Sequence, residues 1–167
     1  TLGVDLTRLD FVVLSHRHVD HTSGLNYVLS VNPGVSIYTP GDPAIFSALT
    51  SGPLMKLIQR KVDAVPEDLR YFDGQPPARL AAGTPWPGAQ FSTIRDLTEV
   101  LPGFFLFSTQ SDVTGTKEMN EISMAIKTPK GTIVIVGCSH PGIEKILATA
   151  SKIDSRIYSV FGGFHLV

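Results

Sequence analysis

The chain of 167 residues is long enough for one domain with its own hydrophobic core. Its 14 basic and 15 acidic residues leave a net charge of −1, which argues against nucleic-acid binding and against attraction to an anionic membrane. Every apolar run is far shorter than the roughly 20 residues of a transmembrane helix. The single cysteine, Cys138, rules out an internal disulfide and is compatible with a reducing compartment, so we expect a cytoplasmic protein.

The first part of the chain predicts an alternation of strands and helices. Residues 9–15 are apolar and rich in Val and Leu, which indicates a buried strand. After a polar segment, residues 22–34 carry a helical apolar stripe that ends at a Pro-Gly pair. Residues 35–39 predict a second strand, and residues 42–50 predict a short helix that begins with Asp-Pro.

The segment from residue 40 to residue 102 has a different composition. It contains nine of the twelve prolines and few periodic segments. A stretch this long and irregular is typical of a functional loop or a disordered one. We expect a partly ordered insertion that lies over one end of the sheet.

Regular patterns resume after this insertion. Residues 103–108 predict a strand, and a polar loop follows over residues 109–120. Residues 121–137 predict a β-hairpin, with alternating apolar residues and a Thr-Pro-Lys-Gly turn. Residues 141–154 predict an amphipathic helix and residues 156–163 a last strand, so the element order indicates a mixed α/β domain over residues 1–167.

All the histidines fall at or just beyond the C-terminal end of a predicted apolar strand, where ligands bind in α/β sheets. They are His16, His18, His21, His140 and His165. In extended backbone, residues two apart point the same way, so the first two can aim at one point with Asp20 beyond them. His21 breaks this alternation and can face a second point close by.

These side chains favour a metal site over a solvated polar loop. Imidazole nitrogens bind zinc or iron, carboxylate oxygens tolerate several metals, and a cluster without thiolates suggests a catalytic site with an open water position. Cys138 lies two residues before His140, as a thiol nucleophile would, but it closes an apolar strand. We therefore interpret it as a small buried residue.

Several motifs resemble those of one enzyme family. The segment "SHRHVDHTSG" matches the His-x-His-x-Asp-His signature of the metallo-β-lactamase superfamily, and "GCSHPGI" resembles its next histidine motif. Together with "NEISMAIKTPKG" and "GGFHL", they resemble the subgroup of the 7,8-dihydropterin-6-methyl-(ribofuranosyl)aminobenzene-phosphate synthase type. The resemblance implies a four-layer αββα sandwich with one or two metals at the sheet edges.

The resemblance also implies the ligands. Three histidines would form the first metal site: His16, His18 and His140. Asp20 and His21 would serve the second, and His165 stands where most relatives place an aspartate that bridges both metals. An imidazole has one lone pair for a metal, so His165 cannot bridge in that way. Relatives also begin upstream of residue 1 and continue past "GGFHL", so we expect a truncated chain with an incomplete second site, and exposed sheet edges that a homo-oligomer would cover.

The expected activity is hydrolysis of a small molecule, a phosphoester or ester-like substrate that the subgroup implies to be related to a pterin. Zn²⁺, with Mn²⁺ or Fe²⁺ as alternatives, would supply hydroxide at neutral pH. Asp20 would orient the hydroxide and pass a proton to the leaving group. Lys117, in the polar loop, is a candidate for substrate binding. Two alternatives stay open: an iron-binding redox member of the superfamily, and a fragment that binds metal or ligand without turnover.

Overall fold

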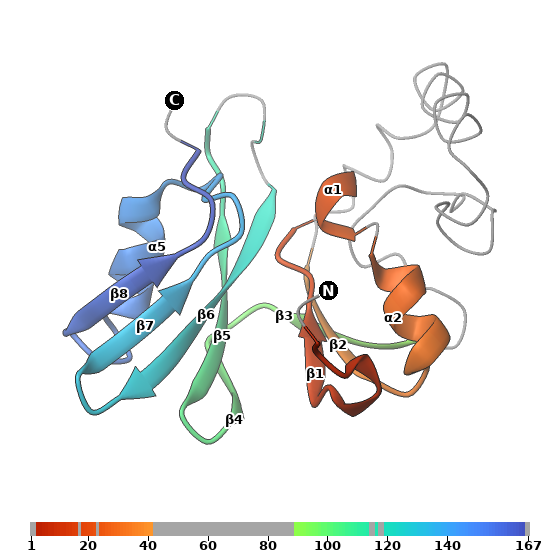
Figure 1. The fold of residues 1–167 in the computed structure, drawn as a ribbon. Helices are drawn as coiled ribbons and strands as arrows, with labels where there is room; N and C mark the ends of the chain where they lie inside the picture. The colour runs from red at the N-terminus through yellow and green to blue at the C-terminus, as the bar shows by residue number, and fades with distance from the viewer. Residues whose placement is uncertain are drawn as a thin grey trace, which may run out of the picture.

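The structure of the chain is a computed structural model that describes residues 3–16, 18–22, 24–41, 89–113, 116 and 119–165. Two β-sheets face each other, and each carries a helix on its outer side (Figure 1). The layers therefore follow the order helix, sheet, sheet, helix, as in the expected αββα sandwich.

The N-terminal sheet is parallel. Its strands lie in the order β1 (Phe11–Val13), β2 (Ser36–Pro40) and β3 (Gln90–Ile94). The short helix η1 (Leu6–Arg8) precedes β1, and α2 (Leu25–Val31) covers one face of the sheet. A hydrophobic cluster joins this helix to the strands; its buried members are Leu14, Leu25, Val35 and Ile37. Each such side chain contributes about 1.5–3 kcal/mol by leaving water.

The C-terminal sheet is mixed. Its strands lie in the order β4 (Thr98–Leu101), β5 (Phe104–Gln110), β6 (Asn120–Thr128), β7 (Gly131–Ile135) and β8 (Ile157–Phe161). Strands β4 to β7 pair antiparallel with their neighbours. Strand β8 is parallel to β7 because the chain returns between them through α5 (Ile143–Ala150).

Helix α5 packs on the outer face of the C-terminal sheet. Its apolar stripe places Ile146 and Ala150 in the largest buried cluster. The sheet contributes the other buried members of that cluster: Phe107, Ala125, Val134 and Val136. The turn before β8 is held by Asp154, which accepts the Arg156 backbone N–H at 2.9 Å, and this bond lowers the pKa of the Asp154 carboxyl.

A third hydrophobic cluster lies between the two sheets. Its buried members are Ile94 from the N-terminal sheet and Leu106 and Ile122 from the C-terminal sheet. Partly buried residues of both sheets pack against them, including Val13 and Met124. The inner faces of the two sheets therefore share one core. This core sets the separation between the two sheets, and so between the strand ends that carry the site.

Most of the predicted elements are confirmed, with one correction in the Pro-rich segment. The hairpin, its flanking strands and α5 all lie where the apolar patterns indicate. The expectation of irregular chain up to residue 102 is wrong at its end, because β3 and β4 occupy residues 90–101. Both strands are short, and β3 is defined by its parallel pairing to β2 rather than by a local pattern. The predicted helix at 42–50 lies outside the described residues.

The predicted helix at 22–34 is divided in two. Helix α1 (Val19–Thr22) comes first and α2 starts after Gly24. The extended alternation expected from His16 to Asp20 is therefore wrong beyond His18, where His21 N–H donates to His18 O at 2.9 Å. Within the described part of the chain, the structure contains no helix both long and apolar enough to cross a membrane.

Candidate metal centre

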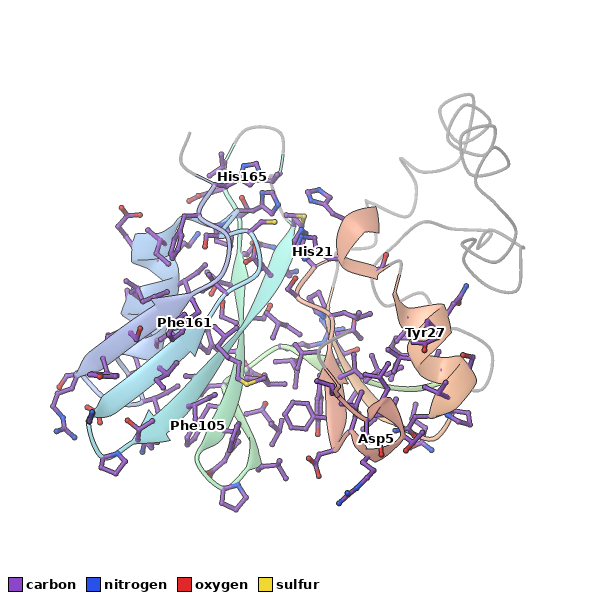
Figure 2. All side chains as sticks on the ribbon, in the orientation of Figure 1. Asp5, His21, Tyr27, Phe105, Phe161 and His165 are labelled. Carbon is purple, nitrogen blue, oxygen red and sulfur yellow. The ribbon has the colours of Figure 1, made fainter. Side chains whose placement is uncertain are left out.

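Histidines from three separate strand ends meet at one end of the sandwich. His16 and His18 follow β1, His140 follows β7 and His165 follows β8, while His21 lies in α1. Figure 2 shows His21 and His165 at this same end of the molecule, on opposite sides of the gap between the sheets. The sandwich therefore brings together residues that are more than a hundred positions apart in the sequence.

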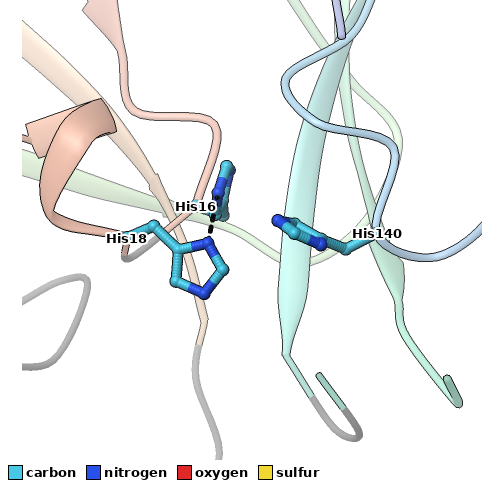
Figure 3. Close-up of side chains that lie close together, drawn as sticks. All are labelled: His16, His18 and His140. Carbon is cyan, nitrogen blue, oxygen red and sulfur yellow. Dashed lines mark hydrogen bonds between the residues drawn. The ribbon is translucent and has the colours of Figure 1, made fainter. Parts of the chain in front are cut away.

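The innermost three histidines form a tripod. His16 Nε2 and His18 Nδ1 are 3.0 Å apart, and the His140 ring approaches them from the other sheet (Figure 3). Ring centroids lie 4.7–4.8 Å apart in all three pairs, and the planes meet at 80°, 76° and 90°. His16 is fully buried and His140 is 8% exposed. Three imidazoles that meet edge to face, with one nitrogen of each close to the others, form a group that could hold a metal ion.

The donor atoms of the tripod fit a divalent metal. One nitrogen from each of His16, His18 and His140 lies within 4.8 Å of the others. In a tetrahedral zinc site with Zn–N bonds of about 2.0–2.1 Å, ligand nitrogens are roughly 3.3 Å apart, so small rotations of these rings are enough. Three neutral nitrogen ligands also leave a fourth position for water or substrate.

Ser15 sets the orientation of two of the rings. Its Oγ lies 3.0 Å from His16 Nδ1 and 3.1 Å from His21 Nδ1. A hydroxyl oxygen has two acceptor lone pairs, so it can accept an N–H from both rings. Each Nε2 then presents its lone pair toward the neighbouring donor atoms of the site, which is the arrangement that outer partners of metal-binding histidines enforce.

Glu121 holds the turn that carries His140. Its side chain is fully buried, and its two carboxylate oxygens accept three backbone N–H groups. The donors are Gly137 at 3.1 Å, Ser139 at 2.9 Å and His140 at 3.0 Å. Ser139 has a φ of +61°, in the left-handed region that costs a non-glycine residue about 1–3 kcal/mol. The bonds to Glu121 offset this cost and fix the direction in which His140 leaves the turn.

Close contacts hold the two halves of the site against each other. The Ile122 N–H donates to Ser15 O at 2.7 Å, so β6 binds the segment that begins the histidine cluster. Gly137 approaches this segment so closely that a Cβ atom there would lie 2.6 Å from Ser15 Oγ. Only glycine fits at this crossing. Strand β6 thus anchors both ligand-bearing segments, through the Ile122 backbone and the Glu121 side chain.

Cys138 and His165 lie at the outer side of the tripod. Cys138 Sγ is 3.1 Å from His21 Nε2. The residue is half-buried, which corrects the interpretation of a small core side chain. The backbone N–H of His165 donates to the Cys138 carbonyl oxygen at 2.9 Å. The centroid of the His165 ring lies 4.7 Å from that of His140, and His165 is exposed. Both residues therefore belong to the same site as the tripod.

The predicted site residues thus fall into two groups. The structure brings together all five histidines, with three as a tripod and two beside it. The Asp20 side chain and Lys117 lie outside what the structure describes. Sequence reasoning missed Ser15 and Glu121. The sequence did contain a signal for Glu121, because a glutamate at the start of an alternating apolar strand needs hydrogen-bond partners when the strand is buried.

Comparison with known proteins agrees with this geometry. The family model of the metallo-beta-lactamase superfamily matches residues 1–157. A 7,8-dihydropterin-6-methyl-4-(beta-D-ribofuranosyl)-aminobenzene-5'-phosphate synthase of Methanocaldococcus jannaschii is 30% identical over 99% of this chain and 59% of its own length. An uncharacterized protein of the same organism is 29% identical over 95% of this chain and 58% of its own. The chain thus spans about three fifths of the length of these relatives.

Solved structures share the fold. The crystal structure of Tm1679, a metal-dependent hydrolase of the beta-lactamase superfamily, aligns with a TM-score of 0.59 and 24% identity, over 99% of this chain and 60% of that one. An N-acyl homoserine lactone hydrolase with product bound at its catalytic metal centre aligns with a TM-score of 0.50 and 16% identity, over 97% of this chain and 58% of that one. The family match, the sandwich and the histidine tripod lead to one conclusion: this chain belongs to the metallo-β-lactamase superfamily.

Proposed function

We propose that this chain carries the metal centre of a metal-dependent hydrolase. The observation that supports the proposal best is the tripod of His16, His18 and His140, which presents three nitrogen ligands and leaves a fourth position. A divalent metal held there would act as a Lewis acid and would lower the pKa of a coordinated water to about 7. Zinc suits this donor set, and iron or manganese are the alternatives.

The residues of the chain prepare the centre for this chemistry. Ser15 keeps the His16 ring in the tautomer that offers Nε2 outward. Glu121 fixes the turn before His140, so the third ligand is in place before a metal arrives. The burial of His16 and His140 removes bulk water from the inner side of the site, which strengthens electrostatic interactions there. For Asp20 we keep the proposed role of orienting the nucleophile and returning its proton.

The proposed substrate class follows from the name of a relative. The name of the relative from Methanocaldococcus jannaschii contains a pterin and an aminobenzene 5'-phosphate. By extension we propose a phosphoester or ester-like substrate, with a pterin-linked aromatic phosphate as the first to try. Such a small molecule would approach the centre from the side of His165, which is exposed.

The test compares metal content and turnover in matched variants. We expect zinc to copurify with or bind to the unmodified chain, and the His16→Ala, His18→Ala double variant to lose it together with hydrolysis of phosphodiester, ester or lactone substrates. Tyr27→Ala is the control, because it removes an exposed ring on α2 that lies away from His21 and His165 (Figure 2). Unchanged zinc content and activity in the double variant would refute the proposal.

Two other outcomes would redirect it. An iron-specific absorption spectrum in the purified chain would favour a redox member of the superfamily over a hydrolase. Tight zinc binding without turnover on any of these substrates would favour a part of the protein that binds metal and depends on further chain for catalysis.

A further inference from the structure

We propose that Cys138 is a metal ligand, and that its thiolate together with His21 forms the second metal position of this centre. The inference rests on the metal centre proposed above and adds to it a donor type, a sulfur, that none of the expected ligands supplies. It replaces the interpretation of Cys138 as an inert residue at a strand end.

The position of the sulfur carries the argument. Cys138 Sγ lies 3.1 Å from His21 Nε2, close to the roughly 3.6 Å that separates sulfur and nitrogen on one tetrahedral zinc. Among the residues that the structure describes, three groups of side chains bring donor atoms within 4.8 Å of one another, and Cys138 belongs to two of them. One contains His16 and His21, and the other contains His140 and His165. The sulfur therefore lies between the tripod and the two outer histidines.

The orientation of His21 supports the same assignment. Its Nδ1 lies 3.1 Å from Ser15 Oγ, so this nitrogen carries the proton when the serine accepts. The lone pair of Nε2 then faces the Cys138 sulfur. Without metal, this contact is a hydrogen bond from the thiol to the imidazole. On metal binding the thiol would lose its proton to solvent, and the sulfur and Nε2 would both be ligands of the ion.

The backbone holds Cys138 in this place on both sides. The N–H groups of Gly137 and Ser139 donate to the buried Glu121 carboxylate. The Cys138 carbonyl accepts the His165 N–H at 2.9 Å, which ties the residue to the segment after β8. A sulfur fixed by its neighbours loses little freedom on binding an ion, and the site is prepared for one.

A thiolate also supplies what the other donors lack. His165 offers a single neutral lone pair, whereas a thiolate is anionic and has several lone pairs, so it offsets part of the charge of a dication and can contact two ions. Sulfur with imidazole favours zinc, cobalt or iron over magnesium and calcium. The proposal therefore predicts a soft-metal preference at the second position, which a carboxylate there would not give.

Cobalt titration tests the assignment directly. Co²⁺ is added to the metal-free chain, and visible absorption reports uptake while the near-ultraviolet sulfur-to-cobalt charge-transfer band reports a bound thiolate. Because the chain has one cysteine, any such band comes from Cys138. We expect the band to develop with the second cobalt equivalent, and Cys138→Ser to lose both the band and tight binding of that equivalent. Circular dichroism checks that the variant is folded.

Histidine variants separate the two positions. The donor atom of His21 lies in one of the groups that contain Cys138, whereas His18 lies in neither of them. His21→Ala should therefore lose the charge-transfer band and His18→Ala should keep it. Zinc should also slow alkylation of Cys138 in the unmodified chain. Cobalt uptake without a charge-transfer band would overturn this inference and leave the proposed hydrolase intact, and so would a band unaffected by His21→Ala. No cobalt uptake at all would overturn both.

Discussion

Replacing Glu121 by glutamine exchanges one carboxylate oxygen for an NH₂ group, beneath the turn that carries His140. Glu121 is fully buried and accepts three backbone N–H groups, two on one oxygen and one on the other. The best rotamer of glutamine keeps its oxygen on Gly137 and Ser139 and turns its NH₂ toward the His140 N–H. Two donors then face each other in a buried site.

The expected cost follows from these bonds. A hydrogen bond to a charged group contributes about 1.5–3 kcal/mol, and an unsatisfied buried donor costs about 1–3 kcal/mol. We therefore expect Glu121→Gln to lower the free energy of unfolding of the metal-free chain by about 3 kcal/mol. Because the direction of His140 depends on this turn, zinc affinity should also fall by about 10- to 100-fold, the usual effect of losing an outer partner.

Urea unfolding and zinc competition with a chromophoric chelator measure the two effects separately. Glu144→Gln is the matched control: Glu144 is exposed in the first turn of α5, where removal of its charge costs no more than about 1 kcal/mol. If Glu121→Gln and Glu144→Gln have the same urea midpoint and the same zinc affinity, the buried carboxylate does not hold the turn and the reasoning is wrong.

Three further predictions concern the same centre. Ser15→Ala removes the acceptor shared by His16 and His21, so zinc affinity should fall about 10- to 100-fold in the chelator competition, and the loss of a partner for the buried His16 ring should lower the free energy of unfolding by about 1–3 kcal/mol. Gly137→Ala places a Cβ 2.6 Å from Ser15 Oγ and should cost roughly 1–3 kcal/mol in urea unfolding, whereas Gly24→Ala, with nothing within 4 Å, should cost far less; equal costs would contradict the close crossing. Zinc at about 100 times its Kd should stabilise the chain by about 2.7 kcal/mol, and a chelator should reverse the rise in Tm; a Tm that ignores both would argue against a metal tied to the fold.

The fold could be predicted where the local pattern and the tertiary contacts agree. The hairpin β6–β7 and helix α5 have the periods of a strand pair and an amphipathic helix, and both are present. Strand β3 could not be found in this way, because its place depends on pairing with β2, some fifty residues earlier in the chain. The split between α1 and α2 was missed because a short turn of helix among ligands has no apolar stripe.

The candidate site could be predicted as a set of histidines that lie near one another, but not as a three-dimensional arrangement. Residue type and position at strand ends were enough to select the histidines, because few other roles explain five imidazoles in such places. The supporting residues carry no such signal. Ser15 looks like any serine after a strand, and Glu121 matters only because the turn after β7 packs over it. Cys138 was misjudged because its distance to His21 depends on how two sheets pack.

The tripod joins two distant parts of the chain, and this has a consequence for folding. His18 follows β1 and His140 follows β7, so an ion bound to both closes a loop on the order of 100 residues, the size of loop for which a disulfide is expected to contribute about 4.7 kcal/mol. A metal bound by this tripod would be a removable cross-link between the two sheets. Because its ligands come from both sheets, the complete tripod forms only after they have docked, so the rate at which a refolding chain acquires tight zinc binding should report this docking step.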